Sequence, residues 1–526
     1  MYFLRILSVI FLIFVCTGSL AQPNTAISGV VRDAQTGETL VGVSVRFLGK
    51  TETGTSTNAY GFYSAMLAPG KYTMVATYVG YKTLTREIQL PADQRVDLNL
   101  NSDNVLSEVV ITSERRNENV VDAQMGLAKV NLAEVKNVPV LFGERDILKT
   151  LQLLPGIKPA GEGNSGFYVR GGASDHNLIL LDEATVYNAS HLLGFFSTFN
   201  SDAIKDVAVY KGGMPAQYGG RLASALDIKM NDGNKKDYTA EGGIGLISSR
   251  LKLEGPISKD KSSFMISGRR TYADAFLTLS SDSSIRDNTI YFYDLNAKVN
   301  FQINDKNTLY LSGYFGRDEL GLANTFGFDW GNATATLRWS RLINSRLFSS
   351  TSLVYSNYDY EIENLLEENG FKVNSGIRNY NLKQDFQYTL GNQHDLKFGL
   401  NAIHHTIMPG KITSGESSSV NDIAIENRKG IEVAAYISDE WEASERLNVV
   451  YGLRAGNFSV LGPGEFRTYD RDGNTLSSEL YSSGKLVKNY LVLEPRISAS
   501  YTLNPTSSVK ASYTRNSQNL HLMSNS

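Results

Sequence analysis

Histidines and acidic residues are the side chains of this sequence best suited to chemistry, and their spacing indicates no catalytic site. The six histidines are His176, His191, His394, His404, His405 and His521. His404 and His405 are adjacent, so on a strand they would point to opposite faces and could not chelate one ion together. No His-x-x-Glu sequence occurs, so a zinc peptidase is not expected. The acidic stretch 361–368 could bind cations, although a solvated charged loop is the simpler interpretation.

A glycine-rich stretch at 161–166 matches the G-x-G-x-x-G pattern of nucleotide-binding loops. That pattern binds phosphates where it follows a strand and opens a helix. Here it follows a predicted helix and Pro159, and no helix is predicted after it. We therefore expect an ordinary loop. Since no catalytic group can be identified in the sequence, we predict a protein that is not an enzyme and has no cofactor.

Composition favours β-structure in more than one domain. The chain has 526 residues, a net charge of -3 and 42% hydrophobic residues, which excludes a disordered chain and gives no polybasic signature for nucleic acid. Tyr (28) and Phe (23) far outnumber Trp (3), and Gly (46) exceeds Pro (12). This balance suits strands and tight turns better than a helical bundle.

Residues 1–21 have the pattern of a signal peptide: one early charge at Arg5, an apolar run, and small residues before Gln22. A membrane anchor is the alternative, but the run is shorter than the roughly 20 residues of a spanning helix. The lone cysteine, Cys16, lies in this segment, so cleavage would leave no thiol for disulfides, catalysis or metal. No later segment is apolar enough for a membrane helix, so membrane entry would require a β-barrel.

Residues 22–101 read as a small β-sandwich of about seven strands, with short β-prone runs separated by turn residues. The stretches Gly29-Val30-Val31-Arg32-Asp33, Thr36-Gly37-Glu38, Gly42-Val43, 58–62 and Gly80-Tyr81 resemble the carboxypeptidase regulatory-like domain, a transthyretin-like fold. Such domains are non-catalytic accessories in most chains that contain them. The resemblance therefore implies a structural or binding role.

Residues 102–117 form a polar linker around one apolar run. The segment Leu106, Ser107, Glu108, Val109, Val110, Ile111 and Thr112 resembles a TonB box, which adds a strand to an energy-coupling protein. Strand addition needs an accessible β-prone segment, because its affinity comes from main-chain hydrogen bonds. The alternative is a plain linker strand.

Residues 118–232 mix α and β signals. The stretch 146–154 places Ile147, Leu148, Leu151 and Leu154 on one helical face, and Pro155-Gly156 ends it, which predicts an amphipathic helix packed on a sheet. Strands are expected at 167–170, 178–182 and 207–211.

Glycine clusters in this region resemble, in order and spacing, the plug of TonB-dependent receptors. The matching residues are Arg170, Gly171, Gly172, Asp182, Lys211, Gly212, Gly213, Tyr218, Gly219, Gly220 and Arg221. Glycines let buried turns adopt positive φ and pack against a surrounding wall. Arg170 and Arg221 would suit contacts between plug and wall, because a guanidinium binds carboxylates bidentately.

Residues 233–526 change to a period of two. Between 295 and 303 every apolar residue falls on one face and every polar residue on the other, and the pattern recurs near 386, 449 and 499. Short polar turns near 258, 304, 344, 391, 443 and 503 alternate with longer connections such as 278–289 and 406–428. This asymmetry, with strands of about ten residues, is typical of an outer-membrane barrel. A soluble sandwich is the alternative.

Aromatic residues expected near strand ends favour the barrel, as interfacial girdles: Tyr291, Tyr293, Tyr310, Trp330, Trp339, Tyr355 and Trp441. We count about thirteen strands, whereas plugged transporters have about 22. The chain therefore resembles the front part of a longer receptor, a mainly β protein with a sandwich, an α/β plug and an antiparallel transmembrane barrel lacking its C-terminal strands.

The resemblance implies import of a scarce ligand, driven through the TonB box by a TonB-type energy-coupling protein. Ferric siderophores are the commonest ligand of the family, and oligosaccharides or peptides are alternatives. The plug has Asp182-Glu183 where glycan importers have Asp-Gly, which argues against a glycan without excluding it. Phe195, Phe196 and Phe199 are candidate ligand contacts, or else plug packing residues. Expected partners are outer-membrane lipid and a surface lipoprotein, and the alternative function is a non-transporting binding or adhesion protein.

Overall fold

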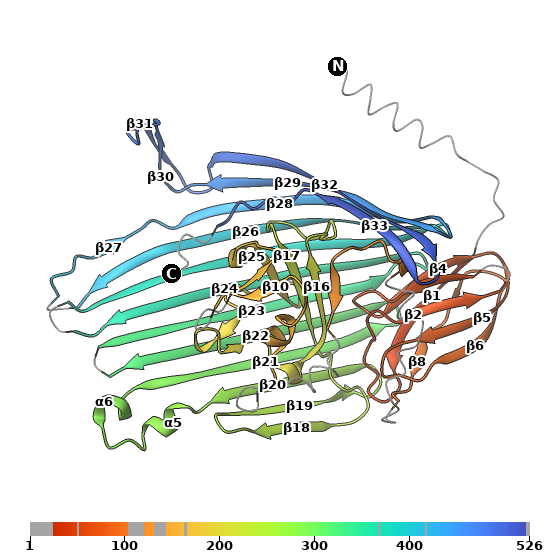
Figure 1. Ribbon diagram of the computed structural model, residues 1–526, viewed down its shortest axis with the longest axis horizontal. Helices are drawn as coiled ribbons and strands as arrows, with labels where there is room; N and C mark the ends of the chain where they lie inside the picture. The colour runs from red at the N-terminus through yellow and green to blue at the C-terminus, as the bar shows by residue number, and fades with distance from the viewer. Residues whose placement is uncertain are drawn as a thin grey trace.

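The computed structural model describes residues 25–49, 52–103, 120–130, 144–161, 166–323, 325–366, 369–415 and 418–521. It contains a small β-sandwich, a mixed α/β body and a large curved antiparallel sheet (Figure 1). The predicted signal peptide (1–21) and the predicted TonB box (106–112) lie outside the described residues.

Among the residues that the structure describes, no helix is both long enough and apolar enough to cross a membrane.

The N-terminal sandwich packs two sheets, ordered β4-β1-β7 with β8 on β1, and β3-β2-β5-β6. Its strands are β1 (Thr25–Asp33), β2 (Ser44–Leu48), β3 (Thr53–Ser56), β4 (Phe62–Leu67), β5 (Gly70–Thr77), β6 (Leu84–Leu90), β7 (Gln94–Arg95) and β8 (Leu98–Leu100). Alternate residues of β2 and β5, including Val45, Phe47 and Met74, are buried between the sheets. Eight strands replace the seven expected from the sequence.

The α/β body, called the plug from here on, is built on a five-stranded sheet of order β13-β12-β17-β16-β9. Its elements are β9 (Leu127–Lys129), α4 (Ile147–Leu151), β10 (Ile157–Pro159), β11 (Phe167–Val169), η1 (Ser174–His176), β12 (Asn177–Leu181), β13 (Ala184–Thr185), β14 (Ser190–His191), η2 (Leu192–Gly194), β15 (Phe196–Ser197), η3 (Ser201–Ala203), β16 (Ile204–Lys211) and β17 (Ser224–Met230). The predicted helix is present, and Asp146 caps it by accepting a hydrogen bond from the Lys149 amide at 3.0 Å. Its buried face contributes Ile147 and Leu151 to the plug core.

The glycine stretch at 161–166 connects β10 to β11, which pair as a hairpin. A short strand therefore precedes it, contrary to the sequence interpretation, but a strand rather than a helix follows it. Residues 162–165 are outside the described ranges. The context does not match the strand-loop-helix order that a nucleotide-binding loop requires.

The large sheet, called the wall, is antiparallel throughout: thirteen strands follow one path from β18 to β33, and β27 pairs with β26. Its elements are β18 (Thr239–Ile244), β19 (Ser248–Ser258), β20 (Ser262–Thr271), α5 (Asp274–Leu277), α6 (Ser283–Arg286), β21 (Thr289–Asn304), β22 (Asn307–Leu322), β23 (Phe326–Leu342), β24 (Leu347–Asn364), β25 (Phe371–Leu390), β26 (His394–Ser414), β27 (Ile423–Ala424), β28 (Arg428–Ser444), β29 (Leu447–Leu461), β32 (Leu486–Asn504) and β33 (Ser507–Thr514). A separate hairpin joins β30 (Gly464–Tyr469) to β31 (Thr475–Tyr481).

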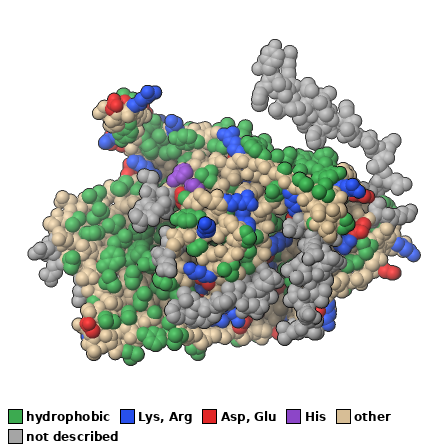
Figure 2. Space-filling model, in the orientation of Figure 1, with side chains coloured by type: hydrophobic (Ala, Val, Ile, Leu, Met, Phe, Trp, Pro, Cys, Tyr) green, Lys and Arg blue, Asp and Glu red, His purple; other side chains and the backbone are tan. Residues whose placement is uncertain are grey.

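The two faces of the wall differ as the period of two predicts. On β21, Leu295 and Phe301 are 48% and 42% exposed, whereas Asn296, Lys298 and Asn300 are at most 1% exposed. The apolar face therefore points outward and the polar face points inward. Hydrophobic side chains are spread over the wall in Figure 2, while Lys and Arg gather near the centre of the view, over the plug.

Several wall strands are longer than the expected ten residues, and β26 has 21. The segment 406–414, expected to be loop, continues β26, and Glu361 and Glu363 of the acidic stretch lie in β24, where both pair with Lys372. Antiparallel pairing continues past the length that a bilayer needs, because each added residue pair satisfies backbone groups.

Two of the predicted girdle aromatics do not face outward. Tyr310 and Trp330 are buried on the inner side of the wall, whereas Tyr293, Trp339 and Trp441 are exposed. Residue type alone did not distinguish the two faces, because large aromatics also fill the space between wall and plug.

The plug lies within the concave side of the wall, and the sandwich lies at the end of the wall that carries the short turns (Figure 1). The helices α5 and α6 mark the opposite end (Figure 1). This arrangement places the buried ion pairs of the interior at contacts between the three bodies.

Candidate functional site

The contact between plug and wall concentrates the charged side chains of the interior. We call the plug surface against β19–β23 the anchor face, and the plug surface against β25–β28 the cavity face. The two faces differ in what lies between plug and wall: buried ion pairs cross the anchor face, whereas a cavity lies on the cavity face.

On the anchor face, Arg269 of β20 joins the plug to the wall. Its guanidinium donates to the Glu144 carboxylate of the plug at 2.9 Å, to Asp294 of β21 at 2.6 Å, and to the Ser197 carbonyl at 2.8 Å. Arg269, Glu144 and Asp294 are each at most 3% exposed. A buried guanidinium needs this full set of acceptors, because its desolvation is costly.

A second buried group centres on Lys298 of β21. Its ammonium lies 3.0 Å from Asp182 and 2.9 Å from Asp232, and donates to the Met230 carbonyl at 2.9 Å. Lys205 of the plug also pairs with Asp232. Burial raises the pKa of Asp182 and Asp232, but the neighbouring cations more than offset this, so the pKa of each carboxyl lies below its usual range.

His191 forms the third group on this face. Its Nδ1 lies 2.6 Å from Asp318 of β22, its Nε2 lies 3.5 Å from Asp294, and its ring stacks on Phe292 with centroids 4.1 Å apart. Burial lowers the pKa of His191, but the two carboxylates outweigh burial and hold that pKa above its usual value. The His191 side chain therefore bridges the plug to two wall strands.

On the cavity face the plug and the wall enclose a cavity of about 60 Å³. Its polar lining includes Arg221 of the plug, Asn381 and Lys383 of β25, Asn401 and His405 of β26, and Glu432 of β28. A cavity of this size has room for about four water molecules. Within the described residues, no hydrogen bond or ion pair joins β26 or β28 to the plug.

Beyond the cavity, β29 and β32 hold the plug turn at 214–221. Arg496 donates to the Met214 carbonyl at 2.9 Å, and Arg454 donates to the Gln217 carbonyl at 3.4 Å. A Cβ added at Gly219 would lie 2.3 Å from Arg454 Nε. Glycine at this position therefore permits the close approach of the wall arginine.

The glycine-motif residues separate into two groups. Asp182, Tyr218, Gly219, Gly220 and Arg221 lie against the wall or line the cavity. The second group lies along the edge of β11 and β16, away from the wall: Arg170, Gly171, Gly172, Lys211, Gly212 and Gly213.

Arg170 does not make the wall contact suggested by the sequence. A Cβ added at Gly212 would meet Arg170 Nη1 at 2.7 Å, so the guanidinium packs on a plug turn. The Lys211 ammonium nearby donates to the Pro155 carbonyl at 2.9 Å. Arg170 thus supports the plug itself, whereas Arg221 lines the cavity together with wall residues.

The sandwich contacts both other bodies through the turn 58–62. The Tyr60 hydroxyl donates to Glu183 of the plug at 2.8 Å, and the Tyr60 ring stacks on Phe348 of β24 with centroids 5.2 Å apart. The Arg338 guanidinium of β23 lies 4.9 Å from the same ring, and Asn58 donates to Gln387 of β25 at 2.9 Å. Gly61, with φ +73°, allows this turn, because its Cβ would lie 2.8 Å from Thr39.

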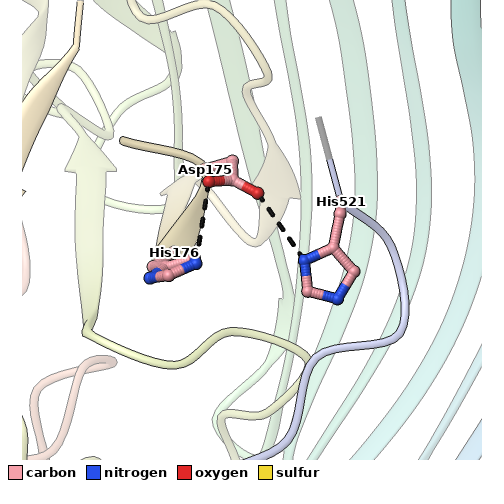
Figure 3. A group of neighbouring side chains, drawn as sticks. All are labelled: Asp175, His176 and His521. Carbon is pink, nitrogen blue, oxygen red and sulfur yellow. Dashed lines mark ion pairs between the residues drawn. The ribbon is translucent and has the colours of Figure 1, made fainter. Parts of the chain in front are cut away.

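Asp175, His176 and His521 are the one group within the described residues whose ligand atoms lie close enough for a metal ion (Figure 3). The Ala173 amide donates to His176 Nδ1 at 3.0 Å. The proton of neutral His176 is therefore on Nε2, the atom that faces Asp175, and a metal there would have to displace it. This geometry favours hydrogen bonding over metal coordination.

Sequence reasoning missed the anchor-face groups Arg269, Asp294, Lys298, Asp318 and Arg338. They could have been found as charged residues at inward positions of transmembrane strands, where an ionisable group is costly unless it serves the interior.

Three family models match the chain in order. They are the CarboxypepD_reg-like domain over residues 27–111, the TonB-dependent Receptor Plug Domain over 128–225, and the TonB dependent receptor-like beta-barrel over 261–521. The chain belongs to the TonB-dependent receptor family. The family resemblance predicted from the glycine motifs is therefore confirmed.

The receptor shares 27% identity over 184 residues with the TonB-dependent receptor P39 of Formosa agariphila, a match covering 34% of this chain and 17% of that protein. Among solved structures, the match with pyoverdine-bound FpvA of P. aeruginosa (TM-score 0.53, 14% identity) covers 76% of this chain and 57% of the FpvA chain. The Serratia marcescens hemophore receptor HasR, in complex with hemophore and heme (TM-score 0.51, 14% identity), covers 76% and 64%. The receptor thus spans less than two thirds of each, and the structural matches show the fold.

Family membership makes this receptor an outer-membrane protein with a plug inside a β-barrel-like wall, as predicted. The family consists of transporters and receptors, so the prediction that the chain is not an enzyme is also confirmed.

The three candidate ligand-contact residues of the receptor have different environments. Phe196 and Phe199 are buried in the plug, Phe196 against Phe292 and Phe199 in the core with Ile147. Phe195 is 52% exposed. A ligand contact therefore stays a prediction for Phe195, while the other two phenylalanines are occupied by packing.

Proposed function

We propose that this receptor imports a scarce ligand across the outer membrane by rearrangement of the plug. The observation that carries the proposal is the composition of the plug-wall contact. It combines buried ion pairs and a cavity with a few apolar contacts, and polar contacts of this kind re-form in water more readily than a continuous apolar core does. A plug held in this way can move and return without exposing a large apolar surface.

The ligand that we propose first is a ferric siderophore, with an oligosaccharide or peptide as the alternative. FpvA in complex with pyoverdine is among the structures of the same fold, which supports the first choice. Exposed Phe195 is the proposed aromatic contact of the plug with the ligand. Growth of a deletion strain, complemented with the full-length gene, on separate iron and glycan sources would identify the ligand class.

Energy coupling is proposed to act through Leu106 to Thr112, where a TonB-type protein would add a strand. The test is removal of residues 106–112 from the full-length receptor, with a polar segment of equal length as replacement. Cells are given a radioiron-labelled catecholate siderophore, and surface binding is measured apart from uptake. We expect uptake to be lost while binding stays within about twofold, because the outer ligand contacts are untouched.

A control replaces residues 102–105 in the same way, which preserves linker length and leaves the box intact. Uptake that continues without residues 106–112 would contradict the proposal and support a binding or adhesion protein. Loss of both binding and uptake would indicate a failure of assembly, which the heat-dependent mobility of the receptor on gels measures directly.

A further inference from the structure

The cavity face contains polar atoms that the protein itself leaves unpaired. His405 Nδ1 lies 2.9 Å from Asn379 Oδ1, so it donates there and Nε2 is left as an acceptor. His405 Nε2, Asn381 Oδ1 and Asn401 Oδ1 are buried and have no hydrogen-bond partner among the described residues. All three residues line the cavity. Their unpaired atoms accept hydrogen bonds, so the site is suited to a molecule that donates them.

Charge in this cavity is balanced. Arg221 and Lys383 supply two cations, and Glu183 and Glu432 supply two anions, all of them lining residues. An ion pathway would show an excess of one sign along its wall. A balanced lining with free acceptors instead favours a neutral hydrophilic surface rich in O–H or N–H groups.

The sandwich does not itself line the cavity, but its Tyr60 bonds to one of the lining residues. Glu183 and Lys383 line the cavity, and the Tyr60 hydroxyl donates to Glu183 at 2.8 Å. Tyr60 also stacks on Phe348, and Asn58 donates to Gln387, so the turn 58–62 is attached to β24 and β25 beside the cavity.

We propose that the cavity face is the site through which hydroxyl- or amide-rich parts of the ligand pass, and that the turn 58–62 of the sandwich closes its end. This inference rests on the proposed import function and specifies where it occurs. The plug would separate from β25–β28, breaking the hydrogen bond from Asn379 of β25 to the Tyr187 hydroxyl, while the ion pairs of the anchor face stay formed. The sandwich then regulates the exit by seating or releasing Tyr60.

Thiol accessibility in the purified full-length receptor, in detergent micelles, tests the proposal without any ligand or energy source. Asn401→Cys reports the cavity face, and Ser263→Cys reports the anchor face, where the Ser263 hydroxyl donates to the Asp232 carbonyl at 2.8 Å. The probe is methanethiosulfonate ethyltrimethylammonium. Since the sequence has one cysteine, Cys16, receptor without an added cysteine gives the background.

We expect Tyr60→Ala to raise the reaction rate at position 401 by about tenfold or more and to leave position 263 within about twofold, because labelling follows the population of the open form. Tyr60→Phe keeps the ring stacked on Phe348 and loses the bond to Glu183, so its increase should be smaller. Tyr78→Ala is the matched control and should change neither rate, because the Tyr78 ring packs against Tyr81 of the sandwich, whereas Tyr60 bonds to the lining residue Glu183.

An unchanged rate at 401 in Tyr60→Ala would overturn the role of the turn. Equal increases at 401 and 263 would show general loosening and would overturn the separation of the two faces. Either result leaves the import proposal standing, because the assay measures no transport. Loss of import in the absence of residues 106–112 has, in turn, no bearing on the rates at position 401.

Discussion

The anchor face and the cavity face of the plug meet the same wall but solve the problem of buried polar groups differently. On the anchor face, Arg269 and Lys298 are each surrounded by carboxylates and a carbonyl, and both are almost fully buried. On the cavity face, His405 and Asn401 keep unpaired acceptors beside open volume. A plug must stay inside its wall and also move. The anchor face can hold the plug in place, while the cavity face allows it to move.

The difference teaches which contacts resist separation. A charge removed from water is strongly disfavoured unless its partner stays with it, so pulling apart a buried pair is costly. The groups that face the cavity, both neutral and charged, can be hydrated as the cavity widens, because it already has room for water. The ion pairs therefore fix the position of the plug, and the plug separates from the wall most easily at the cavity.

Lys298→Met should produce the largest effect. The substitution preserves much of the side-chain volume but leaves Asp182 without its nearest cation and Asp232 with Lys205 alone. Removing one partner of a buried pair costs about 3–5 kcal/mol. We expect the urea midpoint of unfolding of the receptor in detergent to fall accordingly.

The matched control is Lys372→Met in β25, whose pairs with Glu361 and Glu363 of β24 are about half exposed. Exposed pairs contribute about 0–1 kcal/mol, so its midpoint should barely move. Equal shifts of the urea midpoint in the two variants would show that the buried pairs of the anchor face stabilise the receptor no more than exposed pairs do.

Glycine substitutions provide the second comparison. Gly233 has φ +86°, and a Cβ there would lie 2.3 Å from the Phe264 carbonyl oxygen of β20. Gly220 has φ +75°, and its Cβ would lie 3.4 Å from the flexible Glu432 carboxylate. We expect Gly233→Ala to cost about 2–3 kcal/mol through strain and backbone displacement, and Gly220→Ala about 1 kcal/mol through strain alone. Thermal unfolding of the two variants should therefore rank them in this order.

Protonation of His191 makes the anchor face sensitive to pH. Its pKa in the folded receptor is raised by Asp318 and Asp294 despite burial. A raised histidine pKa contributes stability that is complete below the unfolded value near 6.5 and is lost as pH rises through the folded value. Unfolding midpoints of the receptor should fall across this range, and His191→Gln should flatten the curve. A parallel pH dependence in His191→Gln would assign the effect to other groups.

The sequence predicted architecture well where one local pattern determines the outcome. The period of two around Leu295 and Asn296 identified both faces of the wall, and Asp146 with Leu151 identified the helix. Strand length was not predictable beyond the bilayer, because pairing in β26 depends on its neighbours and not on its own residues.

Site geometry was less accessible to the same reasoning. Arg170 and Arg221 both adjoin glycines, yet one packs on Gly212 and the other lines the cavity, since chain direction after each turn decides the outcome. The partners of Arg269 and Lys298 are distant in sequence, so no spacing rule relates them. The role of Tyr60 depends on docking of one domain on two others.

Arg221→Gln should have the smallest effect and is the sharpest test of the cavity face. Arg221 donates to the carbonyl of its neighbour Gly220, and Glu432 keeps Arg454 as a second cation at 3.8 Å. No buried charge is left unpartnered by the substitution, so we expect a stability loss below about 1 kcal/mol. The same variant changes the charge balance of the cavity from neutral to negative. A large loss of stability would show that the cavity face holds the plug as firmly as the anchor face does, and the division between the two would fail.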